Sequence, residues 1–211
     1  MRDVIVFTKV PEKGQVKTRL QRKFPPHVVE ELYTAFLLDT LDQLREYFPY
    51  VAYWPPNKLQ LLWNILGDRK YVQQNGRDLG EKIMNVFRDF RKMGIRDVIV
   101  VGCDVPLMKK EHVQDAFQKM TDCDLVIGPS HDGGFYLIGG HEMTEEIFDK
   151  VDWDGKDVSK RIIENARDSG RKVTTLEELR DIDTPEDIDA VWKTGGLDEK
   201  SRTYRILKRI K

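Results

Sequence analysis

The chain is poor in cysteine and has no long apolar run. Its two cysteines, Cys103 and Cys123, have the spacing of neither a disulfide framework nor a zinc site. No apolar stretch approaches the length that crosses a bilayer. The sequence begins almost directly with the apolar run DVIVFT, without a basic region and a cleavable segment before it. We therefore expect reduced thiols and a cytoplasmic protein with no membrane insertion.

An excess of charge of one sign is also missing. Thirty-five basic residues nearly cancel thirty-six acidic ones, which leaves a net charge of −1 and gives no reason to expect nucleic acid or an anionic membrane as a partner. Two phosphate-binding glycine motifs are absent as well, the P-loop and the dinucleotide fingerprint G-x-G-x-x-G. Any anion site must therefore be local and of another kind.

Strand patterns alternate with helical ones along the chain, with no repeat and no low-complexity tract. This alternation predicts an α/β fold with a mainly parallel sheet. Apolar runs predict strands at 3–8, 50–54, 70–74, 98–101, 125–127 and 135–138. Amphipathic spacing and terminator residues predict helices at 26–47, 58–66, 78–93, 109–120, 156–168 and 185–193.

Two further expectations concern the end of the chain and the last two strands. The runs at 125–127 and 135–138 are too close for a helical crossover, which favours an antiparallel step. We expect one domain over residues 1–194 and a basic tail at 195–211. The tail is either a solvated helix or a helix docked on the body or on a second subunit of a homodimer.

A carboxylate follows the predicted strand at 98–101. The stretch RDVIVVGCDVPLM places Gly102 and then Asp104 directly after four β-branched residues. Ligands of open α/β sheets bind at the carboxyl ends of such buried strands, and Asp is a hard oxygen ligand for a divalent cation. An aspartate here can equally cap the next helix, so this stretch alone leaves both roles open.

The loop after the first predicted strand concentrates positive charge. TKVPEKGQVKTRL brings Lys9, Lys17 and Arg19 together around Gly14. Such a cluster can hold a diphosphate or triphosphate by charge-assisted hydrogen bonds, with Gly14 letting backbone amides approach. The alternative is a solvated basic loop.

A second candidate ligand stands before the helix at 185–193. In DIDTPED, the residues after Asp183 form a helix start, with Thr184 as the N-cap and Pro185 in the first helical position. Asp183 precedes that cap and is free to point elsewhere. If it reaches Asp104, two carboxylates meet, and Mg²⁺ or Mn²⁺ bridging them to phosphate oxygens is the natural occupant.

These motifs also carry a resemblance over residues 3–193. In order, TKVPEKGQVKTRL, QNGRDLGEKI, VVGCDVPLM, GPSHDGGFYLIGG and DIDTPED resemble the CofC-like family of the GT-A nucleotide-diphospho-sugar transferase superfamily, which includes arsenosugar-biosynthesis-type glycosyltransferases. The resemblance implies a three-layer, Rossmann-like GT-A fold with an antiparallel element in the mainly parallel sheet. It implies a divalent cation held by Asp104 and Asp183. It also implies nucleotide-phosphate contacts from a set of loop residues: Lys9, Gly14, Lys17, Arg19, Asp78 and Gly80.

The chain departs from the family pattern in three places. Arg77 stands where the family has Gly, and Lys82 stands where it has Arg. Asp154 and Gly155 replace small hydroxyl residues, so an acceptor contact there does not transfer. Glycosyltransferases of this fold usually carry a D-x-D pair, whereas Cys103-Asp104-Val105 supplies a single acid.

Two reactions and one binding function are compatible with this site. The first is transfer of a sugar from a nucleotide sugar to a small acceptor, the reading that the family name favours. The second is transfer of a nucleotidyl group from a nucleoside triphosphate with release of pyrophosphate. The candidate catalytic residue is Asp132, in the turn His131-Asp132-Gly133-Gly134: a general base or sugar-hydroxyl ligand in sugar transfer, and a group that orients the acceptor in nucleotidyl transfer. Aspartate is also an ordinary turn residue. The third is a GT-A domain that binds a nucleotide without turnover.

Overall fold

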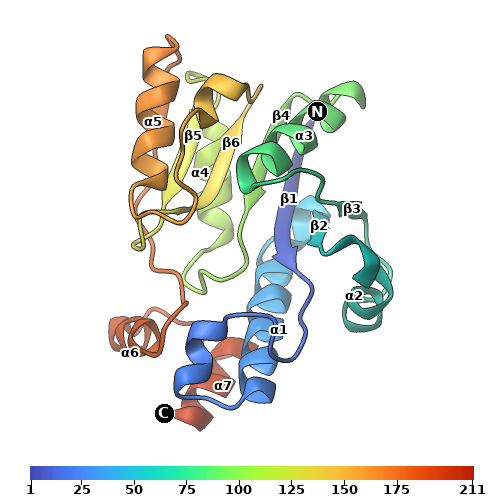
Figure 1. Cartoon of the computed structure of the whole chain (residues 1–211), viewed down its shortest axis with the longest axis vertical. Coiled ribbons are helices and arrows are strands. Elements are labelled where there is room, and N and C mark those ends of the chain that lie inside the picture. The colour runs from blue at the N-terminus through green and yellow to red at the C-terminus, as the bar shows by residue number, and fades with distance from the viewer.

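A computed structural model describes residues 1–211, and its centre is one seven-stranded sheet (Figure 1). The strands lie in the order β3-β2-β1-β4-β6-β5-β7. All neighbouring strands are parallel except β6, which runs antiparallel to both β4 and β5. The strands are β1 (Arg2–Lys9), β2 (Tyr50–Trp54), β3 (Tyr71–Gln73), β4 (Asp97–Val101), β5 (Leu125–Pro129), β6 (Phe135–Gly140) and β7 (Val173–Thr175).

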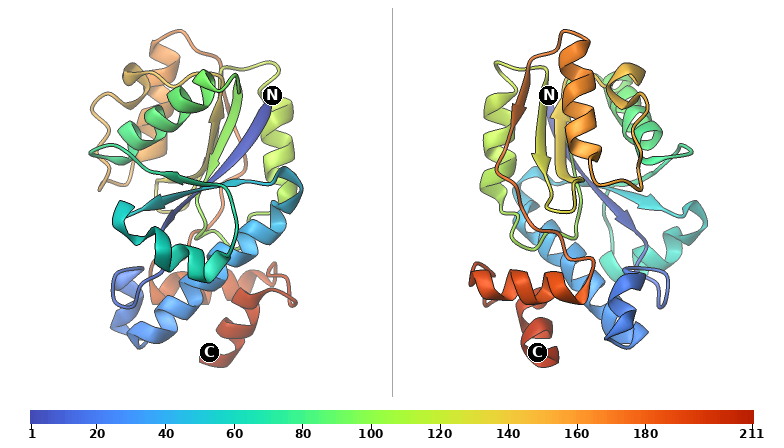
Figure 2. Two further views of the ribbon diagram at one scale, coloured as in Figure 1. Left: turned by 90° about the vertical axis from the view of Figure 1, so that its right-hand side faces the viewer. Right: turned by 60° about the vertical axis from the view of Figure 1, so that its left-hand side comes forward.

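Helices cover both faces of the sheet, so the α/β three-layer expectation is confirmed. They are α1 (Pro26–Gln43), α2 (Leu59–Leu66), α3 (Leu79–Lys92), α4 (Lys110–Lys119), α5 (Val158–Asp168), α6 (Pro185–Thr194) and α7 (Arg202–Ile210). Figure 2 shows α3 and α5 on one side of the sheet and α4 on the other. Alternate strand residues supply the two cores: Ile99 and Val101 pack with α1 and α4, and Val98 and Val100 pack with α3 and α5.

The helix expected over residues 26–47 is shorter than its pattern indicates. Helix α1 ends at Gln43, and residues Arg45–Tyr47 form a separate 3₁₀ turn that stops where Phe48 adopts a left-handed conformation. Leu44 is buried and Tyr47 packs against the core, so the apolar pattern continues after the α-helical backbone has ended. The expectation was wrong at this boundary because side-chain spacing does not distinguish an α-helix from the tighter turn after it.

The antiparallel step is confirmed and explains how the turn after β5 reaches the ligand-binding edge. Val101 of β4 is paired with Leu137 of β6, and Pro129 of β5 is paired with Phe135. The start of β6 therefore lies beside the carboxyl end of β4. The β5–β6 turn, which holds Asp132, consequently lies at the same edge as Asp104.

The chain after β7 continues along this edge. Ser130 is bridged to Leu179, and the backbone N–H of Ile182 donates to the carbonyl of Asp104 at 2.9 Å. Strand β7 itself was not expected, because Val173–Thr175 contains a single apolar residue and so forms no apolar run. Its pairing with β5 fixes the course of the segment that leads to Asp183.

The basic tail docks on the body through α7. Ile206 and Leu207 are buried in the core that holds α1. Arg202 forms ion pairs with Asp39 at 3.2 Å and Asp42 at 2.6 Å, both on α1. The reading of the tail as a solvated helix was therefore wrong, because its apolar stripe has a partner within the same chain. No helix in the structure is long and apolar enough to cross a membrane.

Candidate active site

Lys17 is the central cation of the site. It stands at the end of the loop after β1, where Val16 and Leu20 are buried and anchor the loop on the body. Its side chain is only 10% exposed, and Nζ lies 2.6 Å from Oδ2 of Asp104 and 3.5 Å from Oδ1 of Asp183. One ammonium group thus joins the two carboxylates that the sequence proposed as metal ligands.

The segment before α6 holds Asp183 in place. The Asp187 carboxylate accepts hydrogen bonds from the backbone N–H groups of Asp183 and Thr184, while Thr184 caps the helix. This cap leaves the Asp183 side chain free, and Oδ2 accepts a hydrogen bond from Arg19 Nη1 at 2.8 Å. The structure therefore brings together Asp104, Asp183, Lys17 and Arg19, while their roles as metal ligands and phosphate contacts stay predictions.

The charge state of this pair follows from its surroundings. Burial alone would lower the pKa of Lys17, but the carboxylates of Asp104 and Asp183 outweigh burial and hold that pKa above its ordinary value. Burial would raise the pKa of Asp104, yet Lys17 keeps it below its ordinary value. Lys17 is therefore charged and Asp104 ionised at neutral pH.

The first of two pockets at this edge is lined by basic residues. The cationic pocket has a volume of about 580 Å³, and its lining includes Lys9, Lys17, Arg19, Trp54, Gln74 and Lys82. Lys82 Nζ lies 4.3 Å from the centre of the Trp54 ring. Burial and then the charge of Lys9 lower the pKa of Lys82. Several cations thus face one volume with few acids to balance them, which suits a polyanionic ligand.

Three of the expected nucleotide contacts do not line the cationic pocket. Gly14 lies outside this pocket. Its φ of +80° favours glycine, and no atom lies near the position of a Cβ, so the turn conformation explains this glycine and a close approach of another group does not. Asp78 caps α3, accepting the Glu81 N–H at 2.8 Å. At Gly80 a Cβ would lie 2.6 Å from Trp153. Capping and packing therefore account for Asp78 and Gly80.

The second pocket is acidic. The acidic pocket has a volume of about 190 Å³, and its lining includes Asp104, Asp132, Asp181, Ser130, Phe135 and Trp153. Oδ1 of Asp132 accepts hydrogen bonds from Ser130 Oγ at 2.5 Å and from the Gly134 N–H at 2.9 Å. Asp104 lines both pockets, so a ligand in one would meet a ligand in the other beside it.

Asp181 is a site residue that sequence reasoning missed. Its exposed fraction is 8%, and burial together with the charges of Asp132 and Asp104 raises its pKa to about 7. The available signal was the alternation Asp181-Ile182-Asp183. Ile182 is fully buried, so in extended backbone its two neighbours face the other way, toward the site.

Asp181→Asn should stabilise the metal-free protein more at pH 8 than at pH 5. With a folded-state pKa of about 7 and an unfolded value of about 3.9, the folded protein keeps a proton that the unfolded chain releases between those values. The free energy of unfolding of the parent therefore falls as the pH rises from about 4 to 7. Asparagine cannot ionise, so the variant does not lose this stability as the pH rises. We expect its Tm at pH 8 to be roughly 3–6 °C above that of the parent.

Thermal unfolding in EDTA, followed by circular dichroism at both pH values, checks this expectation. The matched control is Asp122→Asn, which removes an exposed carboxylate from the turn before β5. An equal Tm shift at pH 5 and pH 8 would show that Asp181 does not titrate as described.

The donor set fits a divalent cation in part. Asp104 and Asp183 offer carboxylate oxygens, the ligands that Mg²⁺ and Mn²⁺ prefer. No group of three or more His, Cys, Asp or Glu side chains forms a complete metal site. Mg²⁺ is commonly bound by one or two carboxylates together with substrate phosphates and water, so two aspartates beside a cationic pocket are a suitable set.

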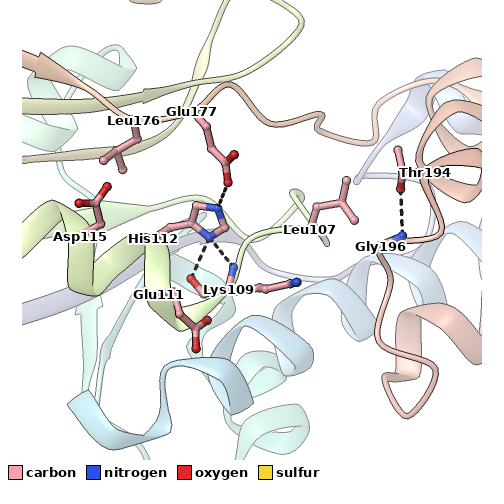
Figure 3. A pocket seen from close by; sticks show the side chains of 9 residues that line it. All are labelled: Leu107, Lys109, Glu111, His112, Asp115, Leu176, Glu177, Thr194 and Gly196. Atoms are coloured by element: carbon pink, nitrogen blue, oxygen red, sulfur yellow. Dashed lines mark hydrogen bonds and ion pairs between the residues drawn. The ribbon is translucent and has the colours of Figure 1, made fainter.

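A larger pocket of about 820 Å³ lies apart from this edge (Figure 3). It shares no lining residue with the cationic or the acidic pocket. His112 sits at its wall with Nδ1 accepting the Lys109 N–H at 2.9 Å and Nε2 2.6 Å from Oε1 of Glu177. Both ring nitrogens are occupied, so His112 ties α4 to the segment after β7.

Relatives in sequence are guanylyltransferases. The chain is 25% identical over 144 residues to the 2-phospho-L-lactate guanylyltransferase of Methanocaldococcus vulcanius, a match that covers 67% of this chain and 61% of that enzyme. The enzyme of the same name from Methanocaldococcus jannaschii is 24% identical over 136 residues, which cover 63% of this chain and 57% of that enzyme. The chain thus matches less than two thirds of the length of each. The expected likeness to CofC enzymes is confirmed.

Solved structures share the fold. A provisionally named nucleotide-diphospho-sugar transferase from Desulfovibrio desulfuricans G20 superposes with a TM-score of 0.92 at 29% identity, covering 99% of this chain and 94% of that one. The 4-diphosphocytidyl-2C-methyl-D-erythritol synthase of Anaerococcus prevotii gives a TM-score of 0.55 at 12% identity, covering 91% and 99%. The second likeness bears on the fold alone. Together with the sheet order, they confirm the nucleotide-diphospho-sugar transferase fold.

A family profile covers more than half of the chain. Residues 37–155 match the family described as "Uncharacterized protein conserved in bacteria (DUF2064)". The matched residues run from within α1 to the segment just before α5 and include both Asp104 and Asp132. The chain belongs to this DUF2064 family.

Proposed function

We propose that the chain is a metal-dependent nucleotidyltransferase that moves a nucleoside monophosphate from a nucleoside triphosphate to a small acceptor. The observation that carries this proposal is the contact of Lys17 with Asp104 and Asp183 at the point where the cationic and acidic pockets meet. The guanylyltransferase relatives favour this reaction over the sugar transfer that the sequence favoured.

The cationic pocket is the donor site. Its volume of about 580 Å³ lies within the usual range for a small-molecule ligand. Lys9, Lys17, Arg19 and Lys82 offset the charge of a triphosphate, which carries far more negative charge than any other common donor. Trp54 then remains to contact the nucleoside, whereas Gln74 is buried and its side-chain amide donates to the carbonyls of Thr8 and Ala52.

The reaction is an in-line displacement at the α-phosphorus. The acceptor oxygen forms a bond to this phosphorus, the bond to the bridging oxygen of the β-phosphate breaks, and pyrophosphate leaves with that electron pair. Lys17 and Arg19 stabilise the charge that develops on the leaving group. Asp104 and Asp183 would hold Mg²⁺ or Mn²⁺, which supplies further charge neutralisation on the phosphates.

Asp132 is the group placed to receive the acceptor's proton. Ser130 and the Gly134 N–H fix one carboxylate oxygen, and these two hydrogen bonds hold the group at the acidic pocket. A base must lie within hydrogen-bond reach of the proton that it takes, so a fixed carboxylate in the acceptor's pocket is suitable.

Sugar transfer is the second candidate, and the Desulfovibrio structure favours it. A nucleotide sugar would use the same cations, with a nucleoside diphosphate as the leaving group. Within that reading the arsenosugar-type branch stays a prediction. The single acid of Cys103-Asp104-Val105 weighs against it, because Cys103 is buried and forms hydrogen-bond contacts with Thr8 and Tyr33, leaving no second acid for a D-x-D pair.

Nucleoside triphosphates should stabilise the protein in the presence of Mg²⁺, and sugar nucleotides should not. A ligand at one hundred times its Kd adds about 2.7 kcal/mol to the free energy of unfolding, or roughly 5–10 °C in Tm for a chain of this size. Thermal-shift measurements with and without Mg²⁺ or Mn²⁺, paired with an assay for released pyrophosphate, check this expectation. Stabilisation by sugar nucleotides alone would refute nucleotidyl transfer, and binding with no product under any acceptor would indicate a non-catalytic domain.

A further inference from the structure

The two pockets that meet at Asp104 have opposite charge. The cationic pocket is lined by four basic residues, Lys9, Lys17, Arg19 and Lys82, and by two acids, Asp104 and Asp183, so basic residues are in excess. The acidic pocket is lined by three aspartates and by no lysine, arginine or histidine. If the donor occupies the first, the acceptor must enter the second, so the lining of the acidic pocket determines which acceptors are admitted.

An acceptor that carries a phosphate group is a poor match for this lining. A phosphate monoester brings a charge of about −1.5 to −2 at neutral pH. In the acidic pocket it would face the carboxyl groups of Asp132 and Asp181, and that of Asp104, whose charge Lys17 balances. The lining holds no basic side chain that could pair with the phosphate. A divalent cation at Asp104 would already be engaged by the phosphates of the donor.

Basic residues near the acidic pocket do not change this balance. Four basic residues line a neighbouring pocket, which shares only Gly155 with the acidic pocket: Lys150, Lys156, Lys160 and Arg161. Three acids also line that neighbouring pocket and partly compensate its charge: Asp152, Asp157 and Glu164.

The fixed carboxylate of Asp132 is informative about the nucleophile. A phosphate oxygen is already ionised near neutral pH and needs no base, whereas a hydroxyl group must lose a proton as it attacks. Asp132 is held by Ser130 and Gly134 in the pocket where that proton would be released. Beside Asp104, the carboxylate of Asp132 would only repel a phosphate acceptor, whereas it can take the proton from a hydroxyl acceptor.

We propose that the acidic pocket takes a small unphosphorylated acceptor and that a hydroxyl group of this acceptor is the nucleophile. The pocket of about 190 Å³ has the volume of about six water molecules, enough for a small polyol or for the reacting end of a larger alcohol. The hydroxyl oxygen bonds to the α-phosphorus, its proton passes to Asp132, and pyrophosphate leaves. The donor in this step rests on the proposed function. The acceptor class differs from the phosphorylated acid in the relatives' names.

Matched pairs of acceptors test this proposal on the whole chain. Each pair contains an alcohol and its phosphate ester: glycerol with glycerol 3-phosphate, myo-inositol with its 1-phosphate, and glucose with its 6-phosphate. With GTP and Mg²⁺ we expect the alcohol to increase pyrophosphate release at least about tenfold more than its ester, with the nucleotidylated product identified by mass spectrometry. Faster release with the ester would overturn the proposal.

Two further measurements decide the case in which none of these compounds reacts. Titration calorimetry with glycerol 3-phosphate on protein saturated with Mg²⁺ and a non-hydrolysable GTP analogue should give no binding heat, and stoichiometric binding would overturn the proposal. Asp132→Asn should lower the slow release of pyrophosphate to water by about 10²-fold or more, with Asp122→Asn unchanged. An increase in Asp132→Asn would indicate that this carboxylate only repels the nucleophile, which would also overturn it.

The same assays separate the acceptor class from the donor. If GTP and the other triphosphates release no pyrophosphate but a nucleotide sugar releases its nucleoside diphosphate, the proposed nucleotidyl transfer has failed. The ratio of alcohol to ester is then measured on that release and still decides whether the acceptor is an unphosphorylated alcohol.

Discussion

Lys17→Met should lower the free energy of unfolding of the metal-free protein by about 2–4 kcal/mol. Removing one partner of a buried ion pair typically costs about 3–5 kcal/mol because the other charge stays buried and unpaired. The side chain of Asp104 is 33% exposed and that of Asp183 28%, so water compensates part of this loss. Urea unfolding in EDTA, with the parent as reference, measures the effect.

A double variant separates the lost charge pair from lost packing. Lys17→Met/Asp104→Asn removes both charges while keeping an unbranched chain at 17 and a side chain of the same size at 104. We expect it to recover at least half of the loss seen in Lys17→Met. If the double variant loses as much stability as the two single variants together, the ion pair does not stabilise the fold.

Mg²⁺ should also stabilise Lys17→Met more than it stabilises the parent, because the variant has lost the ammonium group between the carboxylates of Asp104 and Asp183.

Asp104→Asn should abolish the metal-dependent part of nucleotide binding. The substitution removes one anionic ligand and leaves a neutral side chain of the same size, so the triphosphate affinity in Mg²⁺ should fall about 100-fold or more toward the metal-free value. Turnover should fall by about 10³-fold, since the charge neutralisation provided by the cation is needed most as the leaving group departs. Calorimetric titration with GTP, in Mg²⁺, Mn²⁺ and EDTA, measures the binding.

Two results qualify that expectation. Affinity in EDTA should rise slightly or stay the same in Asp104→Asn, because a negative charge next to the phosphates has been removed. Undiminished Mn²⁺-dependent binding in the variant would remove Asp104 from the metal site. Arg19→Ala is the matched control: it should weaken triphosphate binding with and without metal by a similar factor, since Arg19 acts on charge directly.

Most of the fold could be predicted because its signals are local. The β-branched run at Val98–Val101 and the amphipathic pattern of α3 are properties of adjacent residues, and both elements are present. Strand β7 and the 3₁₀ end of α1 could not be predicted in this way. Strand β7 depends on its pairing with β5. The 3₁₀ turn after α1 depends on a change of backbone geometry that leaves the apolar pattern unchanged.

The site could be predicted where strand ends determine it. Asp104 and the loop holding Lys17 follow parallel strands, whose carboxyl ends share one edge, so their meeting follows from the fold class. Asp181 could not be predicted as a site residue, because its position depends on contacts of the segment after β7 that the sequence alone does not reveal. Asp78 and Gly80 were assigned by resemblance alone, and capping and the contact with Trp153 explain both.

The contact between Lys17 and Asp183 also determines when the site can form. The two residues are 166 positions apart in the chain, so the ribosome adds Asp183 long after Lys17. At about 5–20 residues per second, the ribosome needs roughly 10–30 s to pass from the first to the second. During that interval β1 can already pair with β2 and β4, while Lys17 still lacks Asp183. A nascent chain can therefore pair its central strands before it completes its site.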